Sequence, residues 1–153
     1  MKSIIIILVL LLTAQRMMLA EEKQTTISKP KENSFMKTEF LLSKSELKAG
    51  EKTFIEVRFI PKEKIHVNIE VFPEFKIDSL APISLLNNLI VPKDKDTTYM
   101  DVNKKLKQEI KVNAGVKKGN YTLKGTCAYL YCNEAEGWCN RFVQKFELPF
   151  VVK

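Results

Sequence analysis

Alternation of apolar and polar residues constrains the fold of this chain more than any other feature. The alternation has a period of two and occurs in four stretches: 40–42, 55–59, 65–71 and 142–152. Successive side chains of a β-strand point to opposite faces, so this period places the apolar residues on one face. A helical period of 3.6 is not sustained anywhere along the chain. The pattern therefore predicts half-buried β-strands.

Turn-forming residues separate these stretches at 48–51, 61–63 and 117–120. Each of these segments contains Gly or Pro beside polar residues, a combination that favours turns. Residues 75–105 are less regular, and we expect one or two short strands and a long loop there. A long strand is expected over 121–132. Seven to nine short strands with frequent turns predict an all-β fold, an immunoglobulin-like antiparallel β-sandwich.

The first 20 of the 153 residues differ from the rest. Lys2 precedes the apolar run 4–12, and the small residue Ala20 stands before two acidic residues, which is the order of a secretory signal peptide. The run is shorter than the roughly 20 apolar residues of a membrane-spanning helix. We therefore expect a signal peptide over 1–20, with an uncleaved anchor as the alternative. A polar linker is expected over 21–37 and one domain over 38–153, located in the periplasm or secreted.

The charge pattern argues against several classes of partner. The chain is basic, with 25 Lys and Arg residues against 18 Asp and Glu residues. Most of these basic residues are lysines, and the only arginines after the expected signal peptide are Arg58 and Arg141. Nucleic-acid binding usually requires clustered arginines with aromatic residues between them. The one histidine, His66, has no second ligand at a metal-binding spacing. We expect a monomer with no nucleic-acid partner, no metal and no cofactor. The chain would contact a membrane only through residues 1–20, and only if this segment is not cleaved.

Three cysteines, Cys127, Cys132 and Cys139, lie close together in the sequence. If residues 127–132 are extended, the first two α-carbons are roughly 16 Å apart, whereas a disulfide needs them within about 7 Å. The turn-prone residues 133–137 can fold the chain back and bring Cys132 to Cys139. The sequence therefore predicts a Cys132–Cys139 disulfide. Cys127 is expected to be a small buried hydrophobe, with an intermolecular disulfide as the alternative.

The residues around the predicted disulfide suggest how it would react. Glu134 and Glu136 lie between the cysteines, and nearby carboxylates raise the pKa of a thiol. Tyr131 and Trp138 each precede one of the two cysteines. The reduced pair would be a slow nucleophile, so we expect a partner's thiolate to attack the disulfide. The alternative is a purely structural disulfide, as is common in exported proteins.

Several segments carry a resemblance to a known family. They are Gly119-Asn120-Tyr121, Tyr131-Cys132, Trp138-Cys139 and 146–152, together with Leu47-Lys48-Ala49-Gly50 and Pro61 followed by 65–68. Over about residues 38–152 the chain resembles the N-terminal domain of the thiol:disulfide interchange protein DsbD and its freestanding relatives. The chain departs from the family in the six residues between its paired cysteines and in the additional Cys127.

This resemblance implies an immunoglobulin-like periplasmic domain in which Cys132 and Cys139 form mixed disulfides with thioredoxin-like partners. If the pair is active, the chain is a protein-disulfide reductase component that relays electrons to or from these partners. Members of the family shield the pair with an aromatic residue on a cap loop, and the candidates here are Phe72 and Phe75. Both are also candidates for ordinary core or edge packing.

A second hypothesis belongs to a different functional class. The chain could be a secreted binding or assembly module, with a lipid or protein ligand and a structural disulfide. The apolar stretch 85–90 would then line a cavity, or an edge strand would be presented to a partner.

Overall fold

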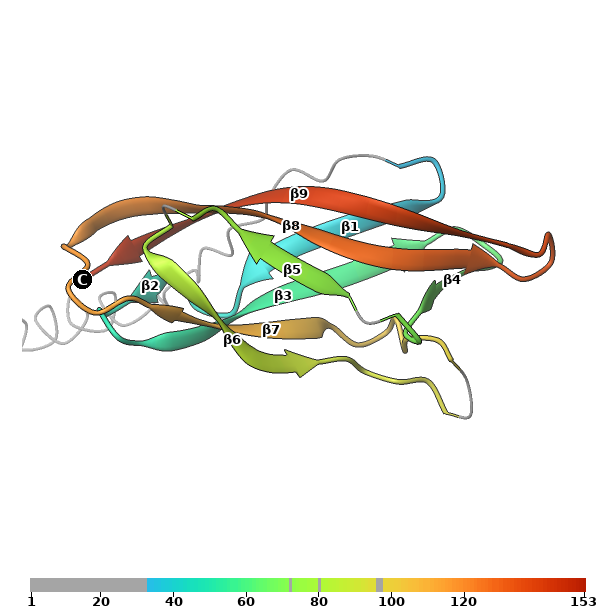
Figure 1. The fold of residues 1–153 in the computed structure, drawn as a ribbon, viewed down its shortest axis with the longest axis horizontal. Coiled ribbons are helices and arrows are strands. Elements are labelled where there is room, and N and C mark those ends of the chain that lie inside the picture. Colours follow the sequence, from blue (N-terminus) through green and yellow to red (C-terminus); the bar gives the residue numbers. More distant parts are fainter. Residues whose placement is uncertain (1–32, 72, 80, 96–97) are drawn as a thin grey trace, which may run out of the picture.

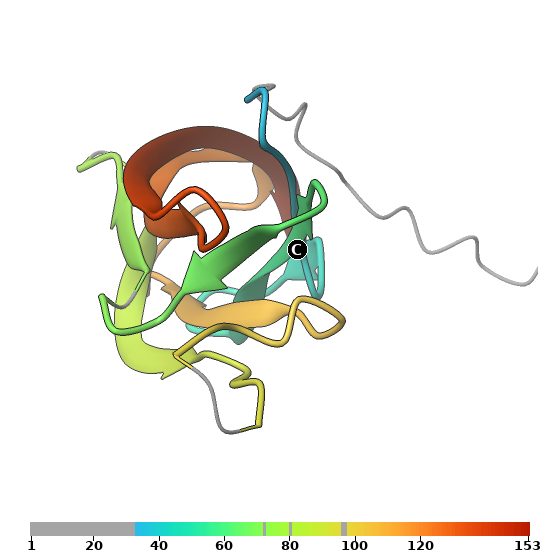
Figure 2. The same cartoon turned by 90° about the vertical axis from the view of Figure 1, so that its right-hand side faces the viewer.

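The computed structural model describes residues 33–71, 73–79, 81–95 and 98–153, and this part of the chain is built from nine β-strands (Figure 1). The strands form two sheets that face each other across the interior, as the view from one end shows (Figure 2). The predicted all-β fold is therefore confirmed. Its immunoglobulin-like character stays a prediction. The expected signal peptide and most of the expected linker lie outside the described residues.

The first sheet has four strands in the order β1-β3-β7-β6. Their bounds are Met36–Leu42 for β1, Lys52–Pro61 for β3, Leu106–Val112 for β7 and Ile83–Ile90 for β6. All three pairings within this sheet are antiparallel. β1 begins two residues before the expected start of the domain at residue 38.

The second sheet has the order β2-β9-β8-β4, and β5 also pairs with β8. Its strands are Glu46–Leu47 (β2), Trp138–Val152 (β9), Gly119–Asn133 (β8), Ile65–Asn68 (β4) and Glu74–Ile77 (β5). The short β2–β9 pairing is parallel, whereas β8 pairs antiparallel with β9, β4 and β5. Among the residues described, no helix is long and apolar enough to cross a membrane.

The core lies between the inner faces of the two sheets, the faces that they turn toward each other. Phe40 of the first sheet stacks on Phe146 of the second, with 5.0 Å between ring centroids. Alternate residues of β3 and β9 are buried there: Ile55, Val57, Phe59, Phe146, Leu148, Phe150 and Val152. The period of two seen in the sequence therefore marks the residues that close the sandwich.

The alternation at 65–71 extends further in the sequence than in the structure. It predicts a strand that reaches Val71, but β4 ends at Asn68 and Val71 is 59% exposed. The chain turns away because the amide of Ile69 donates to the carbonyl of Thr98 (2.9 Å) instead of continuing along β8. Ile69 remains buried, so only the last apolar residue of the predicted strand is misplaced.

The irregular middle of the chain forms β5 and β6, in line with the expectation of one or two short strands. β6 is an edge strand, and its register with β7 shifts between Leu85 and Leu89. The buried Gln108 side chain donates to the carbonyl of Leu86 (2.6 Å) inside this irregularity. Leu85 and Leu89 pack against the core. The apolar stretch 85–90 thus belongs to a sheet edge.

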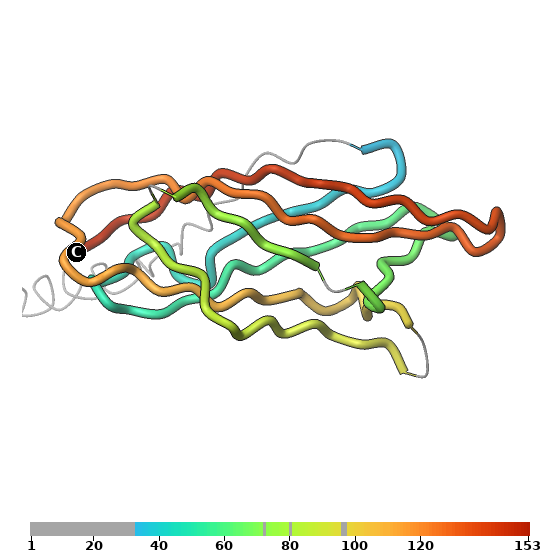
Figure 3. Tube along the Cα trace, viewed as in Figure 1, coloured from blue at the N-terminus to red at the C-terminus, as the bar shows by residue number. Residues whose placement is uncertain are grey.

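The longest element is the hairpin formed by β8 and β9. All fifteen residues of each strand are paired, from Gly119 opposite Val152 to Asn133 opposite Trp138. This hairpin extends beyond the ends of the neighbouring strands (Figure 3). Because the pairing is unbroken, residues of β8 alternate strictly between the inner face and the outer, solvent-side face of the sheet.

Candidate functional site

The candidate site is a disulfide near the tip of the β8–β9 hairpin. Cys132 and Cys139 are directly opposite each other in the β8–β9 register, with their α-carbons 4.0 Å apart and their sulfurs 2.02 Å apart. The predicted Cys132–Cys139 disulfide is confirmed. The long hairpin therefore carries a covalent cross-strand link one residue pair before its turn.

The turn beyond the disulfide is fixed by Asn133. Its side-chain oxygen accepts from the amide of Glu136 (3.2 Å), and its backbone carbonyl accepts from the amide of Gly137 (2.9 Å). Gly137 has a φ of 70°, a conformation that glycine adopts without steric cost. The turn-prone sequence between the cysteines thus performs the chain reversal that the pairing needs.

The two cysteines differ in their exposure to solvent. Cys132 is only 2% exposed, although it lies on the outer face of its sheet, whereas Cys139 is exposed. On its other side, Cys132 is directly opposite His66 of β4. The buried cysteine therefore has its disulfide partner on one side and an exposed imidazole side chain on the other.

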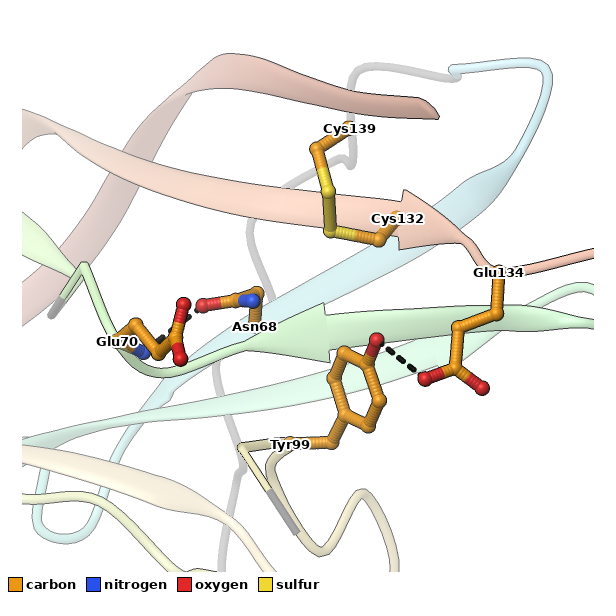
Figure 4. Close-up of a disulfide and its surroundings, with 6 residues drawn as sticks. All are labelled: Asn68, Glu70, Tyr99, Cys132, Glu134 and Cys139. Carbon is orange, nitrogen blue, oxygen red and sulfur yellow. Dashed lines mark hydrogen bonds between the residues drawn. A yellow bond between two sulfur atoms is a disulfide. The ribbon is translucent and has the colours of Figure 1, made fainter. Parts of the chain in front are cut away.

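A segment from the loop before β7 completes this outer face. The amide of Met100 donates to the carbonyl of Val67 (2.9 Å), so residues 98–100 run beside β4. The ring of Tyr99 stacks on that of His66, with 4.8 Å between centroids. Tyr99 also donates its hydroxyl hydrogen to Glu134 Oε1 (2.7 Å) in the hairpin turn (Figure 4). This bond to a carboxylate raises the pKa of Tyr99.

Tyr99 was not recognised from the sequence. It falls in the irregular middle of the chain, and its hydrogen bond reaches a residue 35 positions away. Local periodicity carries no information on such a contact. His66 is exposed on its strand, and its position opposite Cys132 follows from the β4–β8 register, which the sequence pattern does not reveal.

Two residues predicted to flank the pair lie on the opposite face. Tyr131 is buried on the inner face, and Trp138 packs edge-on against it with 5.9 Å between centroids. Phe35, within the predicted linker, packs against Trp138 with 5.1 Å between ring centroids. The indole N–H of Trp138 donates to Glu136 Oε2 (2.6 Å). These aromatic rings therefore support the hairpin tip from inside.

The cap-loop candidates do not cover the disulfide in the part of the chain that the structure describes. Phe72 lies outside the described residues. Phe75 is 8% exposed and packs toward Phe146, with 6.3 Å between ring centroids. Because β5 pairs with residues 125–128 of β8, Phe75 faces Cys127 on the inner side. Phe75 is therefore a core residue, which is the packing alternative that the sequence left open.

Cys127 is a free, fully buried cysteine on the inner face of β8. Burial raises the pKa of its thiol far above the ordinary range. A protonated, inaccessible thiol is a poor nucleophile. The expectation that Cys127 is a small buried hydrophobe is confirmed.

Within the described residues, no three His, Cys, Asp or Glu side chains gather into a group that could hold a metal ion. Comparison with known proteins adds no assignment: no family model matches the chain, and no curated protein or solved structure gives a significant match.

Proposed function

We propose that the Cys132–Cys139 pair exchanges disulfides with a thioredoxin-like protein, as the resemblance to the N-terminal domain of DsbD implies. One observation carries the proposal: the disulfide joins an exposed and a buried cysteine near the tip of a projecting hairpin. Labile and catalytic disulfides are typically exposed ones. The proposal includes an exported location, where disulfides form and persist.

The position of the bond also limits its structural value. Its cysteines are seven positions apart in sequence, and closing so short a loop is worth on the order of 2.5 kcal/mol in the chain-entropy model. The backbone pairing of β8 with β9 already holds the two residues opposite each other. A bond across distant parts of the sequence would restrict the unfolded chain more. This supports a chemical role for the disulfide.

The exposure of the two cysteines gives the order of the exchange. A partner thiolate attacks Sγ of the exposed Cys139 and forms a mixed disulfide, while the Cys132–Cys139 bond breaks. The bonding electron pair leaves with Cys132, which then takes up a proton. A second thiolate of the partner attacks the partner's own sulfur in the mixed disulfide and releases Cys139. Two electrons have then passed to this chain, and the partner leaves oxidised. The reverse sequence passes them onward.

The acidic turn favours attack by the partner. Glu134 and Glu136 stand between the cysteines, and no Lys or Arg occurs among residues 132–139. A reactive cysteine usually has a nearby cation that stabilises its thiolate. The turn therefore supplies no cation to stabilise a thiolate at Cys139, and the exchange begins with the more acidic thiol of the partner.

A trapping experiment tests this proposal. The oxidised chain is incubated with a thioredoxin whose second active-site cysteine has been replaced by serine, so that the mixed disulfide cannot resolve. We expect a covalent 1:1 adduct on a non-reducing gel, mapped by mass spectrometry to Cys139. The matched control is the Cys132→Ser/Cys139→Ser variant, which keeps Cys127 and should give no adduct.

Absence of the adduct, or an adduct at Cys127, would contradict the proposal. Either result would favour the second candidate, a binding or assembly module with a structural disulfide. One observation speaks for that candidate: β6 is an edge strand and its last residue, Ile90, is 46% exposed. An exposed strand edge can pair with an extended segment of a protein ligand.

A further inference from the structure

His66 and Cys132 form a directly opposed pair between β4 and β8. The β-carbons of such a pair are typically about 4.5–5.5 Å apart and on the same face of the sheet. His66 is exposed, whereas Cys132 is buried. The two side chains therefore project from adjacent positions on the outer face of the sheet.

The buried position of Cys132 creates a need for a proton. When the disulfide opens by attack at Cys139, Cys132 becomes the leaving group and carries a negative charge. Burial disfavours a charged thiolate. A nearby group that donates a proton near neutral pH would remove this cost, and histidine is the side chain suited to it. His66 is the only histidine in the chain.

The groups around His66 are fixed by identified contacts. From the loop before β7, Tyr99 stacks on the imidazole, and its hydroxyl is bonded to Glu134 of the hairpin turn. Glu70, two positions beyond the end of β4, also acts on Tyr99 by its charge. From β9, Arg141 pairs with Glu74 at 3.4 Å. Lys64 precedes β4 and is exposed. The ring of Tyr99 therefore covers one face of the imidazole.

We propose that His66 donates a proton to Sγ of Cys132 as the Cys132–Cys139 bond opens. This inference rests on the proposed exchange reaction. The bonding electron pair stays on Cys132, the imidazolium gives up its proton, and the neutral imidazole is reprotonated from water. In the reverse direction the neutral imidazole removes the proton from Cys132. The resulting thiolate attacks Sγ of Cys139 in the mixed disulfide, restores the Cys132–Cys139 bond and releases the partner's thiolate.

The test compares His66→Gln with the unchanged chain, purified with a tag that contains no histidine. The rate of disulfide reduction by excess dithiothreitol is measured from pH 5.5 to 8.5 by quenching and counting thiols. Dithiothreitol ionises to the same extent in both reactions, so the ratio of the two rates does not depend on its ionisation. We expect the unchanged chain to react about 100-fold faster near pH 6, the lower end of the range for general acid catalysis. The two rates should converge toward the alkaline end of this range, where proton donation no longer favours the unchanged chain.

Two further measurements separate proton donation from a structural role. Added imidazole should restore much of the lost rate of His66→Gln near pH 6 and should not accelerate the unchanged chain. His66→Asn should react at the same rate as His66→Gln. Agreement between the two variants would show that the lost rate does not come from a folding defect in one of them.

A rate ratio that stays constant with pH, or a failure of imidazole to restore the rate, would overturn the role of His66. Dithiothreitol needs no protein partner, so these results bear on His66 alone. Failure of the proposed exchange would be seen separately, as absence of the thioredoxin adduct.

Discussion

Cys127 and Cys132 lie on the same strand, five positions apart, yet their surroundings are opposite. Cys127 is on the inner face of β8, fully buried and unpaired. Cys132 is on the outer face, bonded to the exposed Cys139 and opposite His66. Five is an odd number, so strand alternation sends the two side chains to different faces. The comparison shows that strand parity separates an inert thiol from a candidate reactive one.

The neighbours of each face reinforce this difference. On the inner face, the hydroxyl groups of Tyr129 and Thr38 are 3.0 Å apart and hydrogen-bonded, and Phe59 packs against Tyr129. On the outer face, the contacts of Tyr99 with His66 and Glu134 are polar or aromatic and near solvent. Substitutions on the inner face should therefore act on stability, and substitutions on the outer face near the tip should act on disulfide chemistry.

The largest expected effect comes from a pair of leucines on β8. Leu123→Ala removes a fully buried inner-face side chain, and we expect a loss of about 2–5 kcal/mol in the free energy of unfolding. Leu130→Ala, on the half-buried outer face, is the matched control and should cost about 1 kcal/mol or less. Urea unfolding of the oxidised proteins measures both. Equal losses of stability in the two variants would contradict the proposed difference between the inner and outer faces of β8.

Removal of the disulfide should have an intermediate effect. The variant Cys132→Ala/Cys139→Ala should keep its β-sheet circular dichroism signal and lose at most about 2.5 kcal/mol of stability. The β8–β9 pairing and the inner-face core persist without the bond. The unchanged chain, fully reduced with dithiothreitol, serves as the control and should show a similar loss. Global unfolding on reduction would identify the bond as an essential structural element instead.

The smallest effect concerns stability at alkaline pH. Burial raises the pKa of Cys127 above its ordinary value of 9.0 and that of Tyr129 from 10.0 to about 12. A raised folded-state pKa gives stability that is present below the ordinary value and lost as the pH rises above it. For one proton the loss is at most about 1.4 kcal/mol per pH unit.

The urea midpoint of Cys127→Ala should therefore decrease less between pH 9 and 10 than the midpoint of the unchanged chain. Tyr129 and Tyr99, whose pKa values are also raised above 10.0, contribute to the remaining loss above pH 10. If Cys127→Ala falls as steeply as the unchanged chain from pH 9, the buried thiol does not contribute, and the assignment of Cys127 to an inert inner face loses this support.

The sequence predicted those features that local order determines. The period of two located the core residues of β3 and β9, and the turn between Cys132 and Cys139 identified the disulfide. The same period predicts a strand that is longer than β4, which ends at Asn68 because the amide of Ile69 donates to the carbonyl of the distant Thr98. Periodicity along one segment cannot reveal which segment will compete for its backbone groups.

Contacts across strands account for what the sequence missed at the site. The position of His66 opposite Cys132 depends on the β4–β8 register, and the Tyr99–Glu134 bond depends on where residues 98–100 run. The family resemblance makes Phe75 a cap candidate beside a packing role, and the β5–β8 register places it in the core. In each case the register between distant strands decided the outcome.

The measurement that tests the central claim most directly is the reduction potential of the Cys132–Cys139 pair. The chain carrying Cys127→Ser is equilibrated with glutathione or dithiothreitol buffers, and thiols are counted by mass spectrometry. A potential between about −120 and −270 mV, the range of known exchange proteins, is predicted. A potential below about −300 mV is typical of structural disulfides and would contradict the proposal that this pair exchanges electrons with a partner.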